Sequence, residues 1–179
     1  MPIVSLLRRY LRDLVFGAVD GTVTTFAVVA GAVGADLGGG IVLVLGGANL
    51  VADGFSMAVS NYLGTHAHQS QPERRERPRD DDNPDPRAAA LATFIAFTSV
   101  GAVPLIPFAI HAISPSMLAE PLAPSSVMTA LAFLGIGGAK SRATDIPAWH
   151  SAAETLALGG GAAALAFLVG WLLRGVAGV

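Results

Sequence analysis

Two carboxylates lie inside long apolar runs of the sequence, where an ionised side chain is costly. Asp20 is the acid of "AVDGTVTTFAVVAGAVGA", and Asp53 is the acid of "IVLVLGGANLVADGFSMAVSNYLG". An ionised aspartate near the centre of a bilayer costs about 2.5 to 3.5 kcal/mol, so acids in such runs are candidates for binding ions. The alternative is a structural acid paired with a neighbouring helix, and it carries more weight for Asp53 than for Asp20.

Asp53 belongs to a row of polar or soft residues spaced four apart, which places them on one face of a helix: Asn49, Asp53, Met57 and Asn61. Counted from the ends of their runs, Asp20 lies about 9 Å and Met57 about 10 Å below the same membrane boundary. A carboxylate and a thioether at one depth form a mixed oxygen and sulfur site that suits a borderline divalent transition metal. The alternative for Met57 is that it only fills the core.

Other polar residues have two interpretations each. Glu154 stands at the start of the last apolar run, where an acid favours a helix N-terminus, and it is also a candidate for a metal entrance. Thr22, Thr24 and Thr25 follow Asp20 and either bond back to their own helix, which is the commoner role, or line a pathway.

The elements that position these residues are predicted from composition. Of the 179 residues, 53% are hydrophobic and 13% are charged. Soluble domains carry about a quarter of their residues as charges, so these values indicate a membrane protein. The sequence predicts one transmembrane domain over residues 1–179, an all-α bundle of five membrane-spanning helices. The predicted spans are residues 14–35, 41–64, 88–113, 122–139 and 155–173.

Two of the predicted spans have unusual features. The run 122–139 is short and begins with proline and serines, so a four-span bundle in which it is buried or re-entrant is the alternative. Pro104 and Pro107 should kink the third span and free backbone carbonyls inside the bundle.

The charges predict an orientation. Ten of the 11 Lys and Arg, all except Arg174, fall on one side of a five-span arrangement. By the positive-inside rule the N-terminus is cytosolic and the C-terminus lies outside. Residues 65–87 are polar and contain proline, so we expect a flexible cytosolic loop; His66 and His68 belong to it as solvated residues rather than metal ligands. No removable signal peptide is expected.

Composition also limits partners and compartment. The chain has no cysteine, which excludes disulfides and thiolate metal sites. We expect membrane lipid as the surroundings and no nucleic acid partner. Arg outnumbers Lys ten to one, which suggests a high-GC bacterial genome and a cytoplasmic membrane.

Several segments carry a family resemblance. "DLVFGAVDGTVTTFAVVAGAVGA" and "VLGGANLVADGFSMAVSNYL" resemble the first two spans of the vacuolar iron transporter family. "GAVPLIPF", "FLGIGGAKSR" and "SAAETLALGGGAAALAFLVG" are similar to its third, fourth and fifth spans. The resemblance covers the whole chain apart from residues 65–87.

The resemblance implies a five-span homodimer that exports Fe²⁺ and often Mn²⁺ from the cytosol in exchange for protons. The metal path would form between the first and second spans of both subunits. Asp20 matches the acid that binds metal and exchanges protons, and Met57 matches the second-span methionine. Asn49 and Asp53 match the polar face of the second span. The metal is the transported substrate, so no cofactor and no enzymatic activity are implied.

The sequence departs from the family in two places. The long, glutamate-rich helical insert between spans two and three is replaced by residues 65–87, which contain only Glu73 and Glu76. The usual Gly-Glu-Tyr at the end of the second span reads Ser-Asn-Tyr, so Asn61 stands where an anionic ligand is expected. The chain thus resembles the short, nodulin-like branch, with Asn61 and Glu154 as the candidate cytosolic entrance.

Two other function classes compete with transport. A membrane scaffold or regulatory subunit would keep the fold without moving metal, and the missing insert and Asn61 favour it. A membrane-embedded hydrolase is disfavoured, because the intramembrane acids lack a nearby histidine and Ser56 has no base at a helical neighbour position.

Overall fold

The computed structural model describes residues 9–70, 84–141 and 147–176, and the regular elements within them are helices. Five helical segments, counting the broken third one once, are long and apolar enough to cross a membrane. The predicted all-helical fold is confirmed, and the short run 122–139 forms a full helix of its own. The elements are α2 (Leu11–Gly34), α3 (Gly39–Gln69), α5 (Pro86–Gly101), η1 (Val103–Leu105), α6 (Ile106–Ile113), α7 (Leu122–Ser141) and α8 (Ala148–Leu173).

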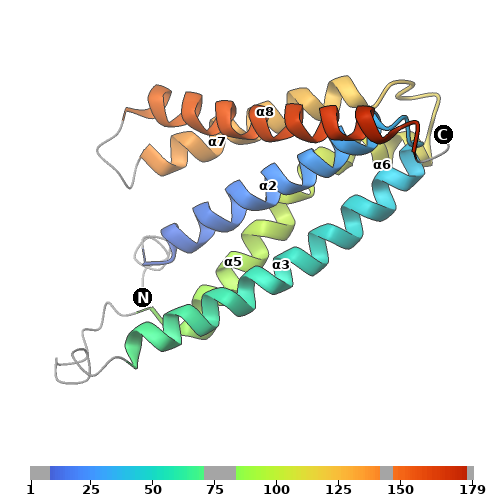
Figure 1. Ribbon diagram of the computed structural model, residues 1–179. Helices are drawn as coiled ribbons and strands as arrows, with labels where there is room; N and C mark the ends of the chain where they lie inside the picture. Colours follow the sequence, from blue (N-terminus) through green and yellow to red (C-terminus); the bar gives the residue numbers. More distant parts are fainter. Residues whose placement is uncertain (1–8, 71–83, 142–146, 177–179) are drawn as a thin grey trace.

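Helix α2 lies at the centre of the bundle (Figure 1) and packs against α3, α5, α7 and α8. Helices α7 and α8 form a pair on one side of it, and α3 and α5 lie on the other. Helix α2 begins at one end of the molecule and α8 ends at the other, as an odd number of crossings requires. Toward the end where α2 begins, the α7–α8 pair separates from α3 and α5.

Small residues let α2 approach its neighbours closely. A Cβ added at Gly17 would lie 2.5 Å from the carbonyl oxygen of Thr93, and one at Gly21 would lie 2.9 Å from the Cα of Phe97. In lipid no hydrophobic effect drives helices together, so close backbone packing of this kind holds them in contact. The fully buried ring of Phe97 fills the space between α2, α3 and α5.

The third span is broken, as its prolines predict. Helix α5 ends at Gly101 and is followed by the 3₁₀ turn η1 and then α6, with Pro104 and Pro107 at the junctions. The carbonyl of Pro104 accepts a buried hydrogen bond of 2.7 Å from the Oγ of Ser125 on α7. A side chain of the neighbouring helix thus satisfies a backbone group at the break.

Two helices extend beyond their predicted ends. Helix α3 continues to Gln69, so residues 65–69 of the expected loop are helical. The ring of His66 stacks on that of Tyr62 one turn earlier, and the side chain of Gln69 donates to the carbonyl of Pro84. Residues 71–83 of the expected loop lie outside the described part of the chain.

Helix α8 begins at Ala148 after Pro147, more than one turn before the predicted start. The interpretation of Glu154 as a residue of the helix start is therefore wrong. Pro147 ends the preceding segment with a ψ of 137°, and the polar residues after it continue the helix. The outer face of α8 exposes Leu165 and Trp171, as expected of a helix in a multi-pass membrane protein.

Candidate metal-binding site

The structure brings Asp20 of α2 and Asp53 of α3 together. Both residues are partly buried between the two helices, and their carboxylates lie close enough to interact electrostatically. Two acids near each other in an apolar bundle repel, and a cation bound by both would relieve the repulsion. The pair is therefore the centre of the candidate site.

The threonines after Asp20 mainly satisfy the helix. Thr22 Oγ1 donates to the carbonyl of Ala18 at 2.7 Å, and Thr24 Oγ1 donates to the carbonyl of Asp20 at 2.8 Å. The expected role of bonding back to the helix is confirmed for these two. Thr25 is fully buried, and its hydroxyl has no hydrogen-bond partner among the described residues.

Met57 and Asn49 lie on α3 on either side of Asp53. Met57 follows Asp53 by one turn, packs against the core that contains Phe97, and also lines a cavity at the end of the bundle. Both interpretations of Met57 thus have support, because its side chain packs against the core and also lines the cavity. Asn49 is partly buried one turn in the opposite direction.

Asn61 connects three helices. Its Nδ2 donates to Asp13 Oδ1 of α2 at 2.8 Å, to Thr93 Oγ1 of α5 at 2.7 Å and to the carbonyl of Ala89 at 3.3 Å. Its Oδ1 accepts from the hydroxyl of Thr65 at 3.2 Å. An amide can both donate and accept, whereas a glutamate at this position would repel Asp13. The residue that replaces the expected acid thus holds another acid in place.

Asp13 is the residue that the sequence analysis missed. It lies seven residues before Asp20, which is two turns along the same face of α2. That spacing was the available signal, and it was overlooked because Asp13 lies just outside the predicted span. The contact with Asn61 across 48 residues of sequence is visible only in the structure.

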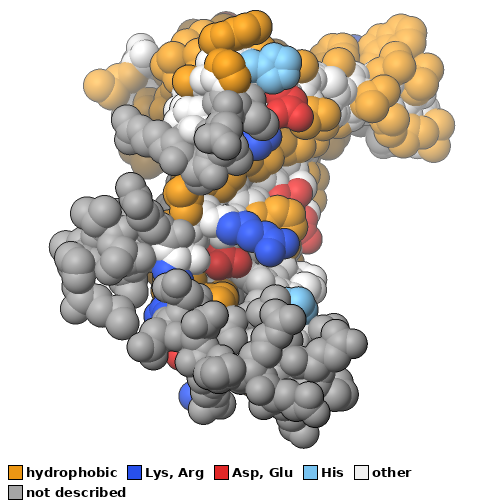
Figure 2. Space-filling model, turned by 90° about the vertical axis from the view of Figure 1, so that its left-hand side faces the viewer, with side chains coloured by type: hydrophobic (Ala, Val, Ile, Leu, Met, Phe, Trp, Pro, Cys, Tyr) orange, Lys and Arg blue, Asp and Glu red, His pale blue; other side chains and the backbone are white. Residues whose placement is uncertain are grey.

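A cavity of about 1130 Å³ opens at this end of the bundle, between the start of α2, the last turns of α3, the end of α7 and the first half of α8. Figure 2 looks onto this end and shows acidic and basic side chains gathered between apolar surfaces. Residues that line the cavity include Arg12, Asp13, Met57, Asn61 and His68. Asp20 is not among the lining residues, so the cavity reaches the side of the candidate site on which Met57 lies.

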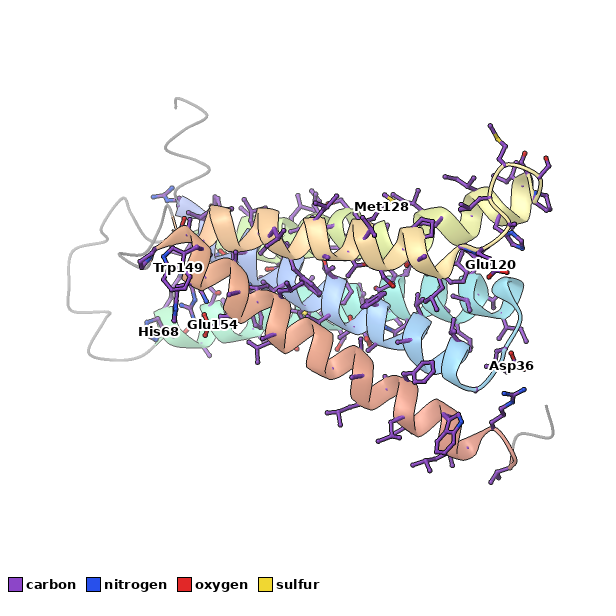
Figure 3. All side chains as sticks on the ribbon, turned by 90° about the horizontal axis from the view of Figure 1, so that it is seen from above. Asp36, His68, Glu120, Met128, Trp149 and Glu154 are labelled. Atoms are coloured by element: carbon purple, nitrogen blue, oxygen red, sulfur yellow. The ribbon has the colours of Figure 1, made fainter. Side chains whose placement is uncertain are left out.

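Glu154 lies at the same end of the molecule (Figure 3), where it forms an ion pair of 2.9 Å with Lys140. Lys140 lines the cavity, and the Glu154 side chain is 49% exposed. His68 of α3 also lies at this end. The structure thus places Glu154 beside the entrance but bound to a cationic side chain.

A single subunit provides an incomplete set of metal ligands. Within residues 9–70, 84–141 and 147–176, no three His, Cys, Asp or Glu side chains gather into one group. The pair of Asp20 and Asp53 has two carboxylates, and divalent cations take four to six or more ligands. Further ligands must come from Met57, amides, water or another copy of the chain.

Five membrane-crossing helices define a multi-pass membrane protein, and the two partly buried acids that interact on α2 and α3 are its candidate cation site. A model of the VIT family matches residues 11–83 and 71–171, and the chain belongs to this family. The two matched parts meet at residues 71–83, between α3 and α5, which is where the sequence analysis found the family's insert missing.

Curated relatives carry transporter names. The chain is 48% identical over 60 residues to a vacuolar iron transporter of Toxoplasma gondii, and this alignment covers 34% of this chain and 20% of that protein. It is 26% identical over 212 aligned positions to vacuolar iron transporter 1 of Eucalyptus grandis, covering 88% and 84%. It is 32% identical over 104 residues to vacuolar iron transporter homolog 4 of Arabidopsis thaliana, covering 55% and 52%.

The lengths of these matches differ. The chain spans a fifth of the Toxoplasma protein and about half of the Arabidopsis one. The alignment with the Eucalyptus protein has 212 positions, more than the 179 residues of this chain, so that protein contains segments without a counterpart here.

Proposed function

We propose that the protein is a membrane transporter that moves a divalent transition metal, Fe²⁺ or Mn²⁺, out of the cytosol in exchange for protons. The observation that carries the proposal is that two partly buried acids, Asp20 and Asp53, interact electrostatically from neighbouring apolar helices. Family membership and the names of the relatives support it.

The exchange follows from the chemistry of the acid pair. With both carboxylates ionised the site carries two negative charges and attracts a divalent cation. Protonation of Asp20 from the more acidic side removes one charge and releases the metal. A protonated carboxylate binds the metal weakly, so proton binding and metal binding compete at Asp20. This competition couples the proton flux to the metal flux.

The other polar residues of α3 complete the path. Met57 supplies a soft thioether one turn from Asp53, on the side of the cavity, and Asn49 supplies an amide oxygen on the far side. Asp13, held by Asn61, provides the acid at the mouth. Glu154 joins the entrance only when it leaves its ion pair with Lys140.

The proposed transporter is a homodimer that packs through α2 and α3. The outer face of α3 exposes large apolar residues, among them Val51 at 60% and Phe55 at 65%. Two copies meeting there would bring two acid pairs near a shared axis and complete the ligand set. The cavity end then faces the cytosol and the C-terminus the outside, in a bacterial cytoplasmic membrane.

Proteoliposomes test the proposal. The full chain is reconstituted, a pH gradient is imposed, and uptake of Mn²⁺ and Fe²⁺ is followed with a fluorescent indicator. The parent protein should transport metal with counterflow of protons, and Asp20→Asn should transport at less than a tenth of the parent rate. Glu120→Gln is the matched control, because Glu120 is exposed at the opposite end of the bundle (Figure 3) and should keep the parent rate.

The competing proposal, a scaffold or regulatory subunit that keeps the fold, makes the opposite prediction. A scaffold would show no saturable metal flux in the parent protein under any gradient. Equal flux in the parent and in Asp20→Asn would instead refute the site while leaving a transporter.

A further inference from the structure

The cavity at the cytosolic end has a polarity gradient that metal transport does not explain. Its lining includes Arg12 in the first turn of α2 and Arg9, which lies just before Tyr10, the N-cap residue of that helix. Neither arginine forms an ion pair with a carboxylate of the described residues. Two guanidinium groups that form no ion pair with a described carboxylate make this mouth unfavourable for a divalent cation and favourable for an anion.

Deeper in the cavity the lining becomes apolar. Val15, Phe16 and Val19 of α2 face it together with Leu158 of α8. Phe16 is 59% exposed and Leu158 is 65% exposed, so these side chains offer a large uncovered surface. From Arg12 to Val19 helix α2 rises about 10 Å, which leads from its first turn toward the interior of the bundle.

Among the described residues that line the cavity, cationic side chains outnumber anionic ones. The carboxylate of Asp13 faces the cavity but is bound by the amide of Asn61. The charge of Lys140 is balanced by Glu154. Within the described lining, Asp13 is thus the acid that faces Arg9 and Arg12.

We infer that the cavity binds an anionic phospholipid of the cytosolic leaflet, with its phosphate between Arg9 and Arg12 and an acyl chain along Phe16 and Leu158. The order of cationic and apolar lining residues matches the order of headgroup and chain in a lipid. Guanidinium groups bind phosphate oxygens in pairs, and basic pockets between helices on the cytosolic side suit anionic headgroups. A soluble anion would leave the apolar wall uncovered.

Native mass spectrometry on the full chain in detergent tests the inference. Phosphatidylglycerol is titrated against phosphatidylcholine with the same acyl chains, and the bound fraction is measured. The parent protein should bind phosphatidylglycerol saturably and in preference to phosphatidylcholine. Arg9→Gln and Arg12→Gln should each weaken that binding about five-fold, and the double variant correspondingly more.

Arg87→Gln is the matched control, because Arg87 is exposed on α5 at the same end of the molecule but does not line the cavity. It should bind phosphatidylglycerol like the parent. If the double variant fails to fold, Arg9→Lys with Arg12→Lys keeps the charges and should keep the preference.

Three results would overturn the inference. They are equal binding of both lipids by the parent, unchanged phosphatidylglycerol binding by the double variant, and displacement of the lipid by millimolar inorganic phosphate. None of them depends on metal transport, so the lipid site and the proposed function can fail separately.

Discussion

At the scale of single residues, the functional interpretation of Asp20 depends on Asp53, and that of Asp53 depends on Asp20. Each acid alone fits a structural role, but two carboxylates that interact across α2 and α3 repel unless a cation or a proton joins them. Asp53 is therefore interpreted as the partner of Asp20, and not only as one residue of the polar row on α3. Met57 and Asn49 extend the same row by one turn in each direction.

Replacement of Met57 by leucine should change metal preference more than stability. Leucine fills a similar volume, so the free energy of unfolding should fall by less than about 1.5 kcal/mol. Loss of the soft thioether should lower the ratio of Fe²⁺ to Mn²⁺ transport at least three-fold, because Fe²⁺ gains more from sulfur. Competition transport assays measure the ratio.

The control for this substitution is Met128→Leu. Met128 lies on α7, away from the cavity (Figure 3), and its replacement should leave the metal ratio unchanged. An unchanged ratio in Met57→Leu as well would assign Met57 to packing alone.

Replacement of Asn61 by leucine should loosen the end of the bundle that contains the cavity. The substitution removes the donor to Asp13 and Thr93 and leaves a carboxylate without its partner. We expect a loss of about 1 to 3 kcal/mol in the free energy of unfolding, measured by denaturation in mixed micelles. Ser60→Ala, at an exposed neighbour on α3, should show a loss of less than about 0.5 kcal/mol. Equal stability of Asn61→Leu and the parent would contradict the structural role.

The candidate site was only partly predictable from the sequence. Helical spacing placed Asn49, Asp53 and Met57 on one face, because that periodicity is a property of one element. The hydrogen bond of Asn61 with Asp13 and the electrostatic interaction of Asp20 with Asp53 join different helices. Depth estimates fix a residue along its helix but not the rotation of that helix about its axis, and rotation decides which side chains meet.

At the scale of elements, the broken third span depends on its neighbour. The buried bond from Ser125 to the carbonyl of Pro104 satisfies a backbone group that has no water to bind in a bilayer. Ser125→Ala should therefore lower the free energy of unfolding by about 1 to 3 kcal/mol. Reversible unfolding in mixed micelles measures the difference.

Ser126→Ala is the matched control for this bond. Ser126 is adjacent on α7, but its hydroxyl donates to the carbonyl of Leu122 in its own helix, so little stability should be lost. Equal losses of unfolding free energy in the two variants would show that the bond to Pro104 contributes no more stability than a bond within α7.

Helix existence was more predictable than helix ends. The lengths of the apolar runs predicted all five spans, and Pro104 and Pro107 predicted the break in the third. The extension of α3 to Gln69 and the early start of α8 at Ala148 were missed, because polar residues do not stop a helix that leaves the membrane. Contacts such as that of Gln69 with Pro84 join segments that sequence periodicity does not relate.

At the scale of the whole molecule, the outer face of α3 is the proposed contact between two copies. The chain has no cysteine, so single cysteines can be introduced without background. Phe55→Cys on α3 should form a cross-linked dimer in native membranes under mild oxidation. Leu165→Cys on the outer face of α8 should stay monomeric, although the two parent residues are 65% and 67% exposed. Cross-linking through position 165 alone would place the interface elsewhere.

The proposed path then runs from the cavity at one end of the bundle, past Asp13 and Met57, to the acid pair in its interior. Its direction rests on the charges, since ten of the 11 Lys and Arg fall on the side of the cavity in a five-span chain. A lipid headgroup at Arg9 and Arg12 would neutralise the entrance.

The most direct test of the central claim is the equilibrium binding of Mn²⁺ to the purified protein, measured from the free-ion signal in electron paramagnetic resonance. The parent should bind Mn²⁺ saturably, and Asp20→Asn and Asp53→Asn should each weaken binding at least ten-fold. Glu120→Gln should bind like the parent. Binding by Asp20→Asn with the affinity of the parent would contradict the claim that this pair of acids holds the metal.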